Sequence, residues 1–181
     1  MDESNFGTGD YHQPDIRQAQ LGDAFDIFNL IKANADRLIV RPIGDIVRNI
    51  DRFTVASSAG KIVACASYTV WPEPGDFEKS IVELTSVVVR DELRGKGFGA
   101  AFVRQVVRQV SRLNPGLIIV LTYTPAFFAK LGFTEIPKTE IMHKIYAGCV
   151  NCTKQVNPFT CPETAMGLAV SAFGATGFPK G

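Results

Sequence analysis

The sequence lacks any apolar run that approaches the ~20 residues needed to cross a bilayer as a helix. Its first residues, MDESNFGTGD, are acidic and polar, and they have none of the features of a secretory signal peptide. We therefore predict a cytoplasmic protein that does not associate with membranes.

The sequence also has almost no net charge, because 19 basic side chains are matched by 18 acidic ones and leave a formal charge of +1. Such a chain has no global field to attract nucleic acid or an anionic membrane surface. We expect its partners to be small molecules that bind at a local site. The sequence leaves homo-oligomerisation open.

With 181 residues, of which 46% are hydrophobic, the chain is long enough for one well-buried core and too short for two. We divide it into a flexible polar tail (1–14), a single folded domain (15–146) and a C-terminal extension that contains cysteines (147–181). The last residues are apolar but rich in glycine, so they either dock on another surface or stay mobile.

Hydrophobic spacing and turn residues predict strands that alternate with helices. In the first helix, for example, Phe25, Phe28 and Ile31 recur at helical spacing. A mixed central sheet flanked by helices, an α/β fold, accommodates this order. The predicted strands are 15–20, two arms of a hairpin within 53–72, 80–89, 116–122 and a segment after 132, and the predicted helices are 21–35, 45–52, 97–113 and 125–132.

The loop RGKGFG, residues 94–99, lies between the predicted strand 80–89 and the predicted helix 97–113. The first N–H groups of a helix have no backbone partner, and the helix dipole adds positive charge there. Glycines let an anion approach the backbone, and Arg94 and Lys96 add formal charge. The loop therefore indicates a phosphate site, with a simple helix-starting turn as the alternative. It matches neither a P-loop nor a dinucleotide fingerprint.

Together with FFAKLGF about thirty residues later, this loop resembles the GNAT superfamily of acyl-CoA N-acyltransferases over roughly residues 15–145. The resemblance implies acetyl-CoA as co-substrate. The residues that it assigns to the coenzyme A pyrophosphate are Arg94, Gly95, Lys96, Gly97, Phe98, Gly99 and Ala100. The backbone edge of Val87, Val88 and Val89 would bind the pantetheine arm.

Thioester aminolysis requires a neutral amine, a donor for the developing oxyanion and a route for a proton. By the same resemblance, the N–H of Val87 or Val88 is the oxyanion donor, and Glu83 takes the proton of the amine directly or through water. The alternative for Glu83 is a surface carboxylate. Many relatives have a tyrosine acid where this chain has Phe128. Tyr123 is our candidate replacement, unless it only packs or the thiolate leaves without an acid.

The segment RLIVRPIGDIVRNIDRFTVASSAGKIVACASY is similar to the acetyltransferase domain of N-acetylglutamate synthases, which begin arginine biosynthesis. This narrower resemblance implies glutamate as the acceptor, in a short, stand-alone form of the enzyme. Glutamate brings two carboxylates, which arginine binds better than lysine. Arg41 is our first candidate for that contact, against a surface ion pair. Arg48 and Arg52 are weaker candidates, because an exposed helix face explains both.

Four cysteines raise a separate question, because Cys149, Cys152 and Cys161 have the close spacing of a zinc knuckle. His143 or Glu163 would be the fourth ligand. The alternative is a set of packed thiols or a disulfide. Cys65 falls in a predicted strand, and we assign it to the core.

Three classes of function are consistent with these observations. The first is a glutamate N-acetyltransferase, and the second is a related enzyme that acts on another small amine or a protein N-terminus. The third is a non-catalytic module that binds acyl-CoA or senses thiols. Arg41 favours the first over the second, and the glycine loop with Glu83 favours an enzyme over a sensor.

Overall fold

The computed structural model describes residues 14–150, 152 and 154–170. These residues form a seven-stranded sheet with the order β1-β2-β3-β4-β5-β7-β6. Strands β4 and β5 pair in parallel, and the other neighbours are antiparallel. The strands are β1 Asp15–Gln18, β2 Phe53–Ser58, β3 Lys61–Trp71, β4 Ile81–Val89, β5 Leu117–Thr122, β6 Thr134–Glu135 and β7 Thr164–Leu168.

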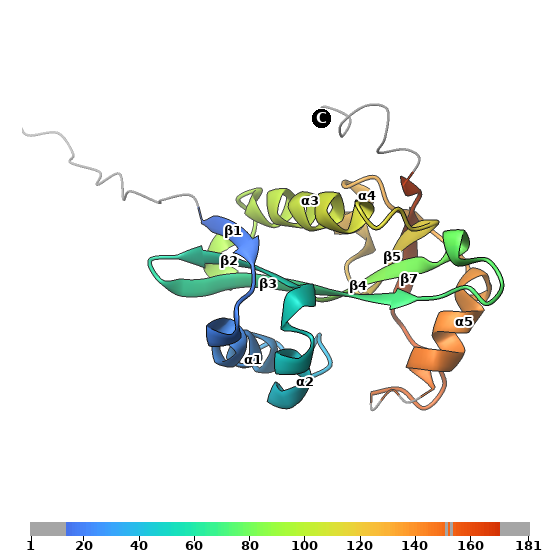
Figure 1. Cartoon of the computed structure of the whole chain (residues 1–181), viewed down its shortest axis with the longest axis horizontal. Helices are drawn as coiled ribbons and strands as arrows, with labels where there is room; N and C mark the ends of the chain where they lie inside the picture. The colour runs from blue at the N-terminus through green and yellow to red at the C-terminus, as the bar shows by residue number, and fades with distance from the viewer. Residues whose placement is uncertain (1–13, 151, 153, 171–181) are drawn as a thin grey trace, which may run out of the picture.

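Helices cover both faces of the sheet, as Figure 1 shows. Helices α3 and α4 lie on one face, and α1, α2 and α5 lie on the other. This arrangement confirms the predicted α/β fold with a mixed central sheet. The helices are α1 Ala24–Lys32, α2 Ile43–Arg48, α3 Phe98–Ser111, α4 Pro125–Ala129 and α5 Met142–Lys144, the last continued by a π-helical turn at Ile145–Cys149.

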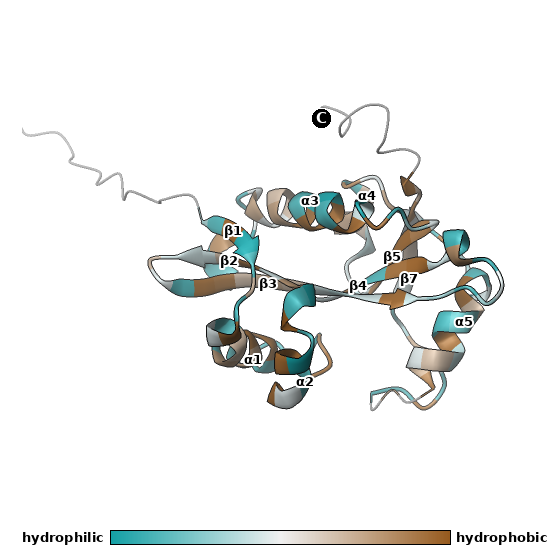
Figure 2. Cartoon of the chain, in the orientation of Figure 1, coloured by the Kyte–Doolittle hydropathy of each residue, from teal (hydrophilic) through white to brown (hydrophobic). Residues whose placement is uncertain are grey.

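The apolar residues of the strands alternate between the two faces, and each face has its own core (Figure 2). On β4, Val82 and Leu84 pack toward α3, whereas Ile81 joins the cluster beneath α5. Because side chains alternate along a strand, Glu83 lies on the same face as Ile81. The alternation of side chains therefore places the Glu83 carboxylate on the face of the sheet that α5 covers.

The first helix forms where it was predicted, but the apolar residues whose spacing indicated it are not all buried. Phe25 is 62% exposed, and the buried residues of α1 are Ala24, Ile27, Leu30 and Ile31. Phe25, Phe28 and Ile31 all lie at i, i+3 spacing, but only Ile31 is at the centre of the stripe that faces β3. The helix was therefore predicted correctly, although Phe25, one of the residues that indicated it, faces solvent.

The sheet also contains a strand from the part of the chain that was predicted as an extension. Thr164–Leu168 form β7, which lies between β5 and β6 and pairs with both. Ala165, Met166 and Leu168 are buried there. Most of the tail (residues 1–13) and the apolar, glycine-rich end (171–181) lie outside the described residues, so the predictions for them stay predictions.

In the described part of the chain, no helix combines the length and apolar character that crossing a bilayer requires.

The position that matters most for function is the centre of the sheet. There β4 pairs with β5 only from Ile81 to Glu83, opposite Leu117 to Ile119, and beyond this point the two parallel strands separate.

A bulge in β4 accompanies this separation. Cys65 pairs with Val88 and Ser67 pairs with Thr85, so β4 has one residue more than β3 across this interval. Ser86 within the bulge has φ +52°, a left-handed conformation that is uncommon outside glycine. The bulge bends β4 while its pairing with β3 continues, and it leaves the other edge of the strand open.

Candidate active site

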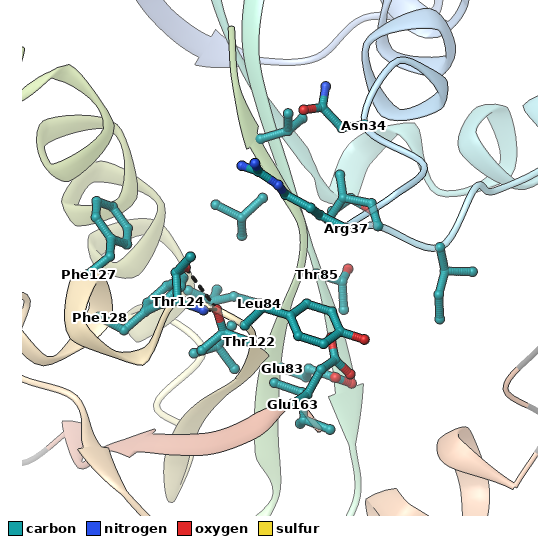
Figure 3. A pocket seen from close by; sticks show the side chains of 18 of the residues that line it. Asn34, Arg37, Glu83, Leu84, Thr85, Thr122, Thr124, Phe127, Phe128 and Glu163 are labelled. Carbon is teal, nitrogen blue, oxygen red and sulfur yellow. Dashed lines mark hydrogen bonds between the residues drawn. The ribbon is translucent and has the colours of Figure 1, made fainter. Parts of the chain in front are cut away.

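A cavity of about 880 Å³ occupies the opening between β4 and β5 (Figure 3). Its lining includes the free edge of β4, the end of β5, the glycine loop of residues 94–99 and the segment that precedes α2. It also includes residues from the C-terminal part of the chain, from Lys144 to Glu163. One continuous space therefore connects the glycine loop with Glu83.

The glycine loop leads directly into α3. Gly95 and Gly97 have φ +73° and +80°, which L side chains rarely adopt, and a Cβ built on either would meet open space. Gly97 is the N-cap of α3. The N–H groups of the first turn of α3 lack helical partners, so the loop presents them without steric cover. The arrangement can bind an anion such as a pyrophosphate.

The side chains of this loop take different positions. Arg94 donates to the Val89 carbonyl at 2.9 Å and to Asn34 at 2.9 Å, and it forms an ion pair with Asp91. These contacts hold the loop against the end of α1. Phe98 packs on the core beside Phe102, with ring centroids 6.2 Å apart. Only its backbone N–H, and not its side chain, is therefore suited to binding an anion. Gly99 and Ala100 line the cavity.

Val87, Val88 and Val89 lie on the part of β4 that has no strand partner on the β5 side. All three line the cavity, and Val88 is buried. Unpaired N–H and C=O groups on a strand edge can bind an extended ligand in the manner of an added strand. The geometry therefore allows both the pantetheine contacts and the oxyanion donor that were predicted for this stretch.

Glu83 is almost fully buried at the point where β4 and β5 separate. Its Oε1 lies 3.0 Å from Lys144 Nζ, and its Oε2 accepts a hydrogen bond of 2.8 Å from Trp71 Nε1. Burial lowers the pKa of Lys144, but Glu83 and the Cys149 sulfur raise it by more, and the net pKa is raised. Lys144 therefore stays an ammonium, and Glu83 is held as its counter-ion. The surface alternative for Glu83 is wrong.

Gly148 permits this arrangement, because a Cβ at this position would lie 2.8 Å from the Trp71 ring. Lys144 also donates to Cys149 Sγ at 3.0 Å. The α5 helix and the turn after it are therefore fitted closely around the two partners of Glu83.

Arg41 lines the cavity and is held by two contacts. Its Nε donates to Ser86 Oγ at 3.2 Å, and its Nη1 lies 3.1 Å from Asp45 Oδ2. A guanidinium has more N–H groups than these two contacts use, so Arg41 can also bind a carboxylate. Arg48, in contrast, is exposed at the end of α2.

Tyr123 follows the last residue of β5 and lines the cavity with 42% of its surface exposed. Burial, followed by the negative charge of Glu163, raises the pKa of its phenol. The phenol therefore remains protonated at neutral pH and can donate a proton. Phe128 packs edge to face on Phe127 and Phe133 in the core.

The predicted zinc site is not supported. Among the described residues, no three His, Cys, Asp or Glu side chains are grouped in a way that could hold a metal ion. Cys149, Cys152 and Cys161 are free thiols that line the cavity, and Cys149 accepts the hydrogen bond of Lys144 instead. Cys65 is buried in β3 as predicted, and burial raises the pKa of its thiol.

Several residues of the cavity were missed by sequence reasoning. Lys144 comes from the C-terminal third of the chain, and Asn34 and Arg37 come from the turn after α1. Glu163, which the sequence suggested only as a zinc ligand, also lines the cavity (Figure 3). No spacing relates these residues to β4, because the contacts arise from the packing of α1, α5 and β7 against the sheet.

Similarity to known proteins identifies the family of this chain. Residues 49–135 match the model of the acetyltransferase (GNAT) domain. An uncharacterised N-acetyltransferase of Chlorobaculum tepidum, CT2212, is 31% identical over 156 residues, which cover 83% of this chain and 93% of that protein. The chain belongs to the GNAT acetyltransferase family. An amino-acid acetyltransferase of Mycobacterium tuberculosis is 27% identical over 74% of this chain and 76% of its own length.

Two solved structures share the fold. Rv2747 from Mycobacterium tuberculosis, in complex with CoA and NLQ, is 25% identical with a TM-score of 0.70, and the match covers 86% of this chain and 99% of that one. N-acetylglutamate synthase from Neisseria gonorrhoeae, complexed with coenzyme A and N-acetyl-glutamate, has a TM-score of 0.69 at 18% identity. That match covers 87% of this acetyltransferase and 35% of the synthase chain.

Proposed function

We propose that this acetyltransferase transfers the acetyl group of acetyl-CoA to the α-amine of L-glutamate, the reaction that opens arginine biosynthesis. The observation that carries the proposal is the single cavity in which a glycine loop, an open strand edge, a buried Glu83 and the arginine Arg41 all face the same space. An acyl-CoA and an amino acid with a second carboxylate suit these groups.

The glycine loop supports the cofactor part of the proposal. Pyrophosphate oxygens would accept hydrogen bonds from the N–H groups at the start of α3, and the pantetheine arm would follow the open edge of β4 at residues 84–89. Rv2747 and the Neisseria synthase, which share this fold, are both complexes with CoA. The thioester would then lie near Val87 and Val88, whose N–H groups would stabilise the oxyanion.

The acceptor part rests on charge. Arg41 would bind one carboxylate of glutamate, and Glu83 would bind the ammonium group before it loses its proton, directly or through water. Tyr123, kept protonated, would donate to the leaving thiolate. The amino-acid acetyltransferase of Mycobacterium tuberculosis, a relative over most of its length, supports an amino acid as acceptor.

The test is a screen of the wild-type protein with acetyl-CoA and each of the twenty amino acids, spermine and a peptide with a free N-terminus. Products are measured by mass spectrometry, because a thiol reagent would also react with the cysteines in the cavity. We expect glutamate to be the fastest substrate and glutamine, which lacks one carboxylate, to be much slower. If spermine or the peptide is acetylated faster than glutamate, the glutamate assignment fails.

A further inference from the structure

Three ionisable side chains from distant parts of the chain meet in the cavity. Glu83 belongs to β4, Lys144 to α5, and Glu163 directly precedes β7. Figure 3 shows Glu83 and Glu163 side by side. Lys144 is the ion-pair partner of Glu83. The charges of these two groups shift the pKa of Glu163 in opposite directions, since Glu83 raises it and Lys144 lowers it. When all three are ionised, the two carboxylates and the one ammonium give this cluster a net charge of −1.

The two carboxylates of this cluster differ in their partners. Both oxygens of Glu83 are engaged, one by the Lys144 ammonium and one by the Trp71 N–H, so an added proton would compete with an existing cation. Among the residues that the structure describes, Glu163 forms no ion pair within 4 Å, and the weak donor Cys161 Sγ hydrogen-bonds to its carboxylate at 3.6 Å. Glu163 is therefore the carboxylate that is able to take a proton.

The surroundings of Glu163 hold that proton more tightly than water would. Burial raises its pKa above the ordinary value, the Glu83 charge adds to the increase, and the Cys161 hydrogen bond and the charges of Lys144 and Lys138 oppose it. Tyr123 faces it from the end of β5. The net pKa is raised, which brings the carboxyl closer to the pH at which a general base works best.

A separate observation concerns a hydroxyl group that neighbours this cluster. Thr85 lines the cavity two residues after Glu83, and its hydroxyl oxygen is buried without a hydrogen-bond partner among the described residues. Buried hydroxyl groups are almost always hydrogen-bonded in native proteins. Thr85 lies on the same face of β4 as Glu83, so this face carries an unsatisfied polar group next to the cluster (Figure 3).

We propose that Glu163 is the catalytic residue that accepts the proton of the acceptor amine, while Glu83, which Lys144 and Trp71 hold in place, positions the ammonium group. The ammonium gives one proton to Glu163, and the neutral amine then attacks the acetyl carbonyl carbon. As the C–S bond breaks, a second proton of the nitrogen goes to the thiolate sulfur through Tyr123 or water. The products are the amide, the coenzyme A thiol and protonated Glu163, which returns its proton to the solvent. This inference rests on the acetyltransferase activity proposed above.

The test compares the dependence of kcat/KM on pH, between about pH 5.5 and 9.5, for the wild type, Glu163→Gln, Glu163→Asp, Glu83→Gln and Glu140→Gln. The substrate is the amine that the wild type acetylates fastest. Glu140→Gln is the matched control, because Glu140 is exposed and is not part of the cavity lining. Circular dichroism and acetyl-CoA binding show whether each variant is folded.

Activity of the wild type requires ionised Glu163, so it should be lost as the pH falls through the raised pKa of that carboxyl. Glu163→Gln should lower kcat at neutral pH by about 10²-fold or more and remove this acid limb. Glu163→Asp should keep the limb at a reduced rate. Glu83→Gln should be slower and should keep the limb, displaced to lower pH, because Glu163 still titrates but has lost the Glu83 charge that raises its pKa.

Two results would overturn the proposal. One is a folded Glu163→Gln protein with the kcat and acid limb of Glu140→Gln. The other is an equal loss at every pH, which would mean a structural role. If Glu163→Gln does not fold, loss of the acid limb in the folded Glu83→Gln protein overturns the proposal, and its retention supports it. If the wild type acetylates an amine other than glutamate, only the glutamate assignment fails, because these comparisons use whichever amine reacts.

Discussion

Arg41 shows how a single side chain can be oriented before its ligand arrives. Ser86 and Asp45 hold the guanidinium from two sides, at 3.2 Å and 3.1 Å, and the Ser86 hydroxyl occupies that place because of the bulge in β4. An arginine fixed in this way loses less conformational freedom when it binds a carboxylate than a mobile one would. The orientation therefore favours a substrate with a matching carboxylate.

We predict that Arg41→Ala lowers kcat/KM for glutamate by roughly 30- to 1000-fold, because a charge-assisted contact to one carboxylate is lost. Arg41→Lys should recover only part of the activity, since a point charge cannot replace the planar fork. Steady-state kinetics with acetyl-CoA at saturation measures both variants. Arg48→Ala, at an exposed position in the same segment, is the control. Equal activity in Arg41→Ala and Arg48→Ala would contradict the assignment.

At the scale of elements, the strand, loop and helix at residues 81–111 form the centre of the site. The open edge of β4 and the first turn of α3 both present backbone groups rather than side chains. This explains why the connecting loop is rich in glycine, since a Cβ would cover the N–H groups or force an unfavourable φ. The chemistry of this part depends on backbone geometry.

Gly97→Glu should therefore abolish acetyl-CoA binding, because it adds a carboxylate and a side chain where the pyrophosphate would lie. Gly60→Glu is a matched control: Gly60 has φ +73° and open space around it, as Gly97 does with φ +80°, but it lies in the β2–β3 turn. Both variants carry the same strain, so a difference in calorimetric affinity reports on the site. Unchanged binding in a folded Gly97→Glu protein would refute the loop assignment.

At the scale of the whole molecule, the C-terminal part of the chain completes both the sheet and the site. Strand β7 pairs with β5 from Ile118 to Thr122, and this pairing continues past Ile119, the last residue of β5 that pairs with β4. The segment between α5 and β7 adds cavity residues, and Lys154 Nζ donates to the Ala35 carbonyl at 2.8 Å. Residues that are distant in the sequence therefore enclose the acceptor end.

Deletion of residues 147–181 should prevent cooperative folding, because it removes β7 and leaves β5 without its antiparallel partner. Thermal unfolding followed by circular dichroism measures this effect. A full-length triple variant, Cys149→Ser with Cys152→Ser and Cys161→Ser, should still unfold cooperatively, because the sheet does not depend on the thiols. A truncated protein that melts as sharply as the full chain would show that β7 is dispensable.

The sequence by itself determined the order of strands and helices up to the segment after residue 132, the glycine loop and the family, but not α5 or β7. These features depend on neighbours in the chain: hydrophobic period, turn residues and a short motif. It also placed Glu83 and Arg41 in segments that line the cavity. Spacing alone does not decide which residues of α1 are buried, because its apolar stripe has alternatives one residue apart, and packing against β3 selects among them.

Only the tertiary structure decided what surrounds Glu83. Lys144, Glu163 and the cavity cysteines come from 60 or more positions away, since Lys144 is 61 residues after Glu83 and Glu163 is 80 residues after it. The spacing of the cysteines suggested a metal, but packing directs Cys149 to Lys144 instead. Local patterns encode which backbone a segment adopts. Which charges share a buried space depends on how α5 and β7 close over the split sheet, and that is a property of the whole fold.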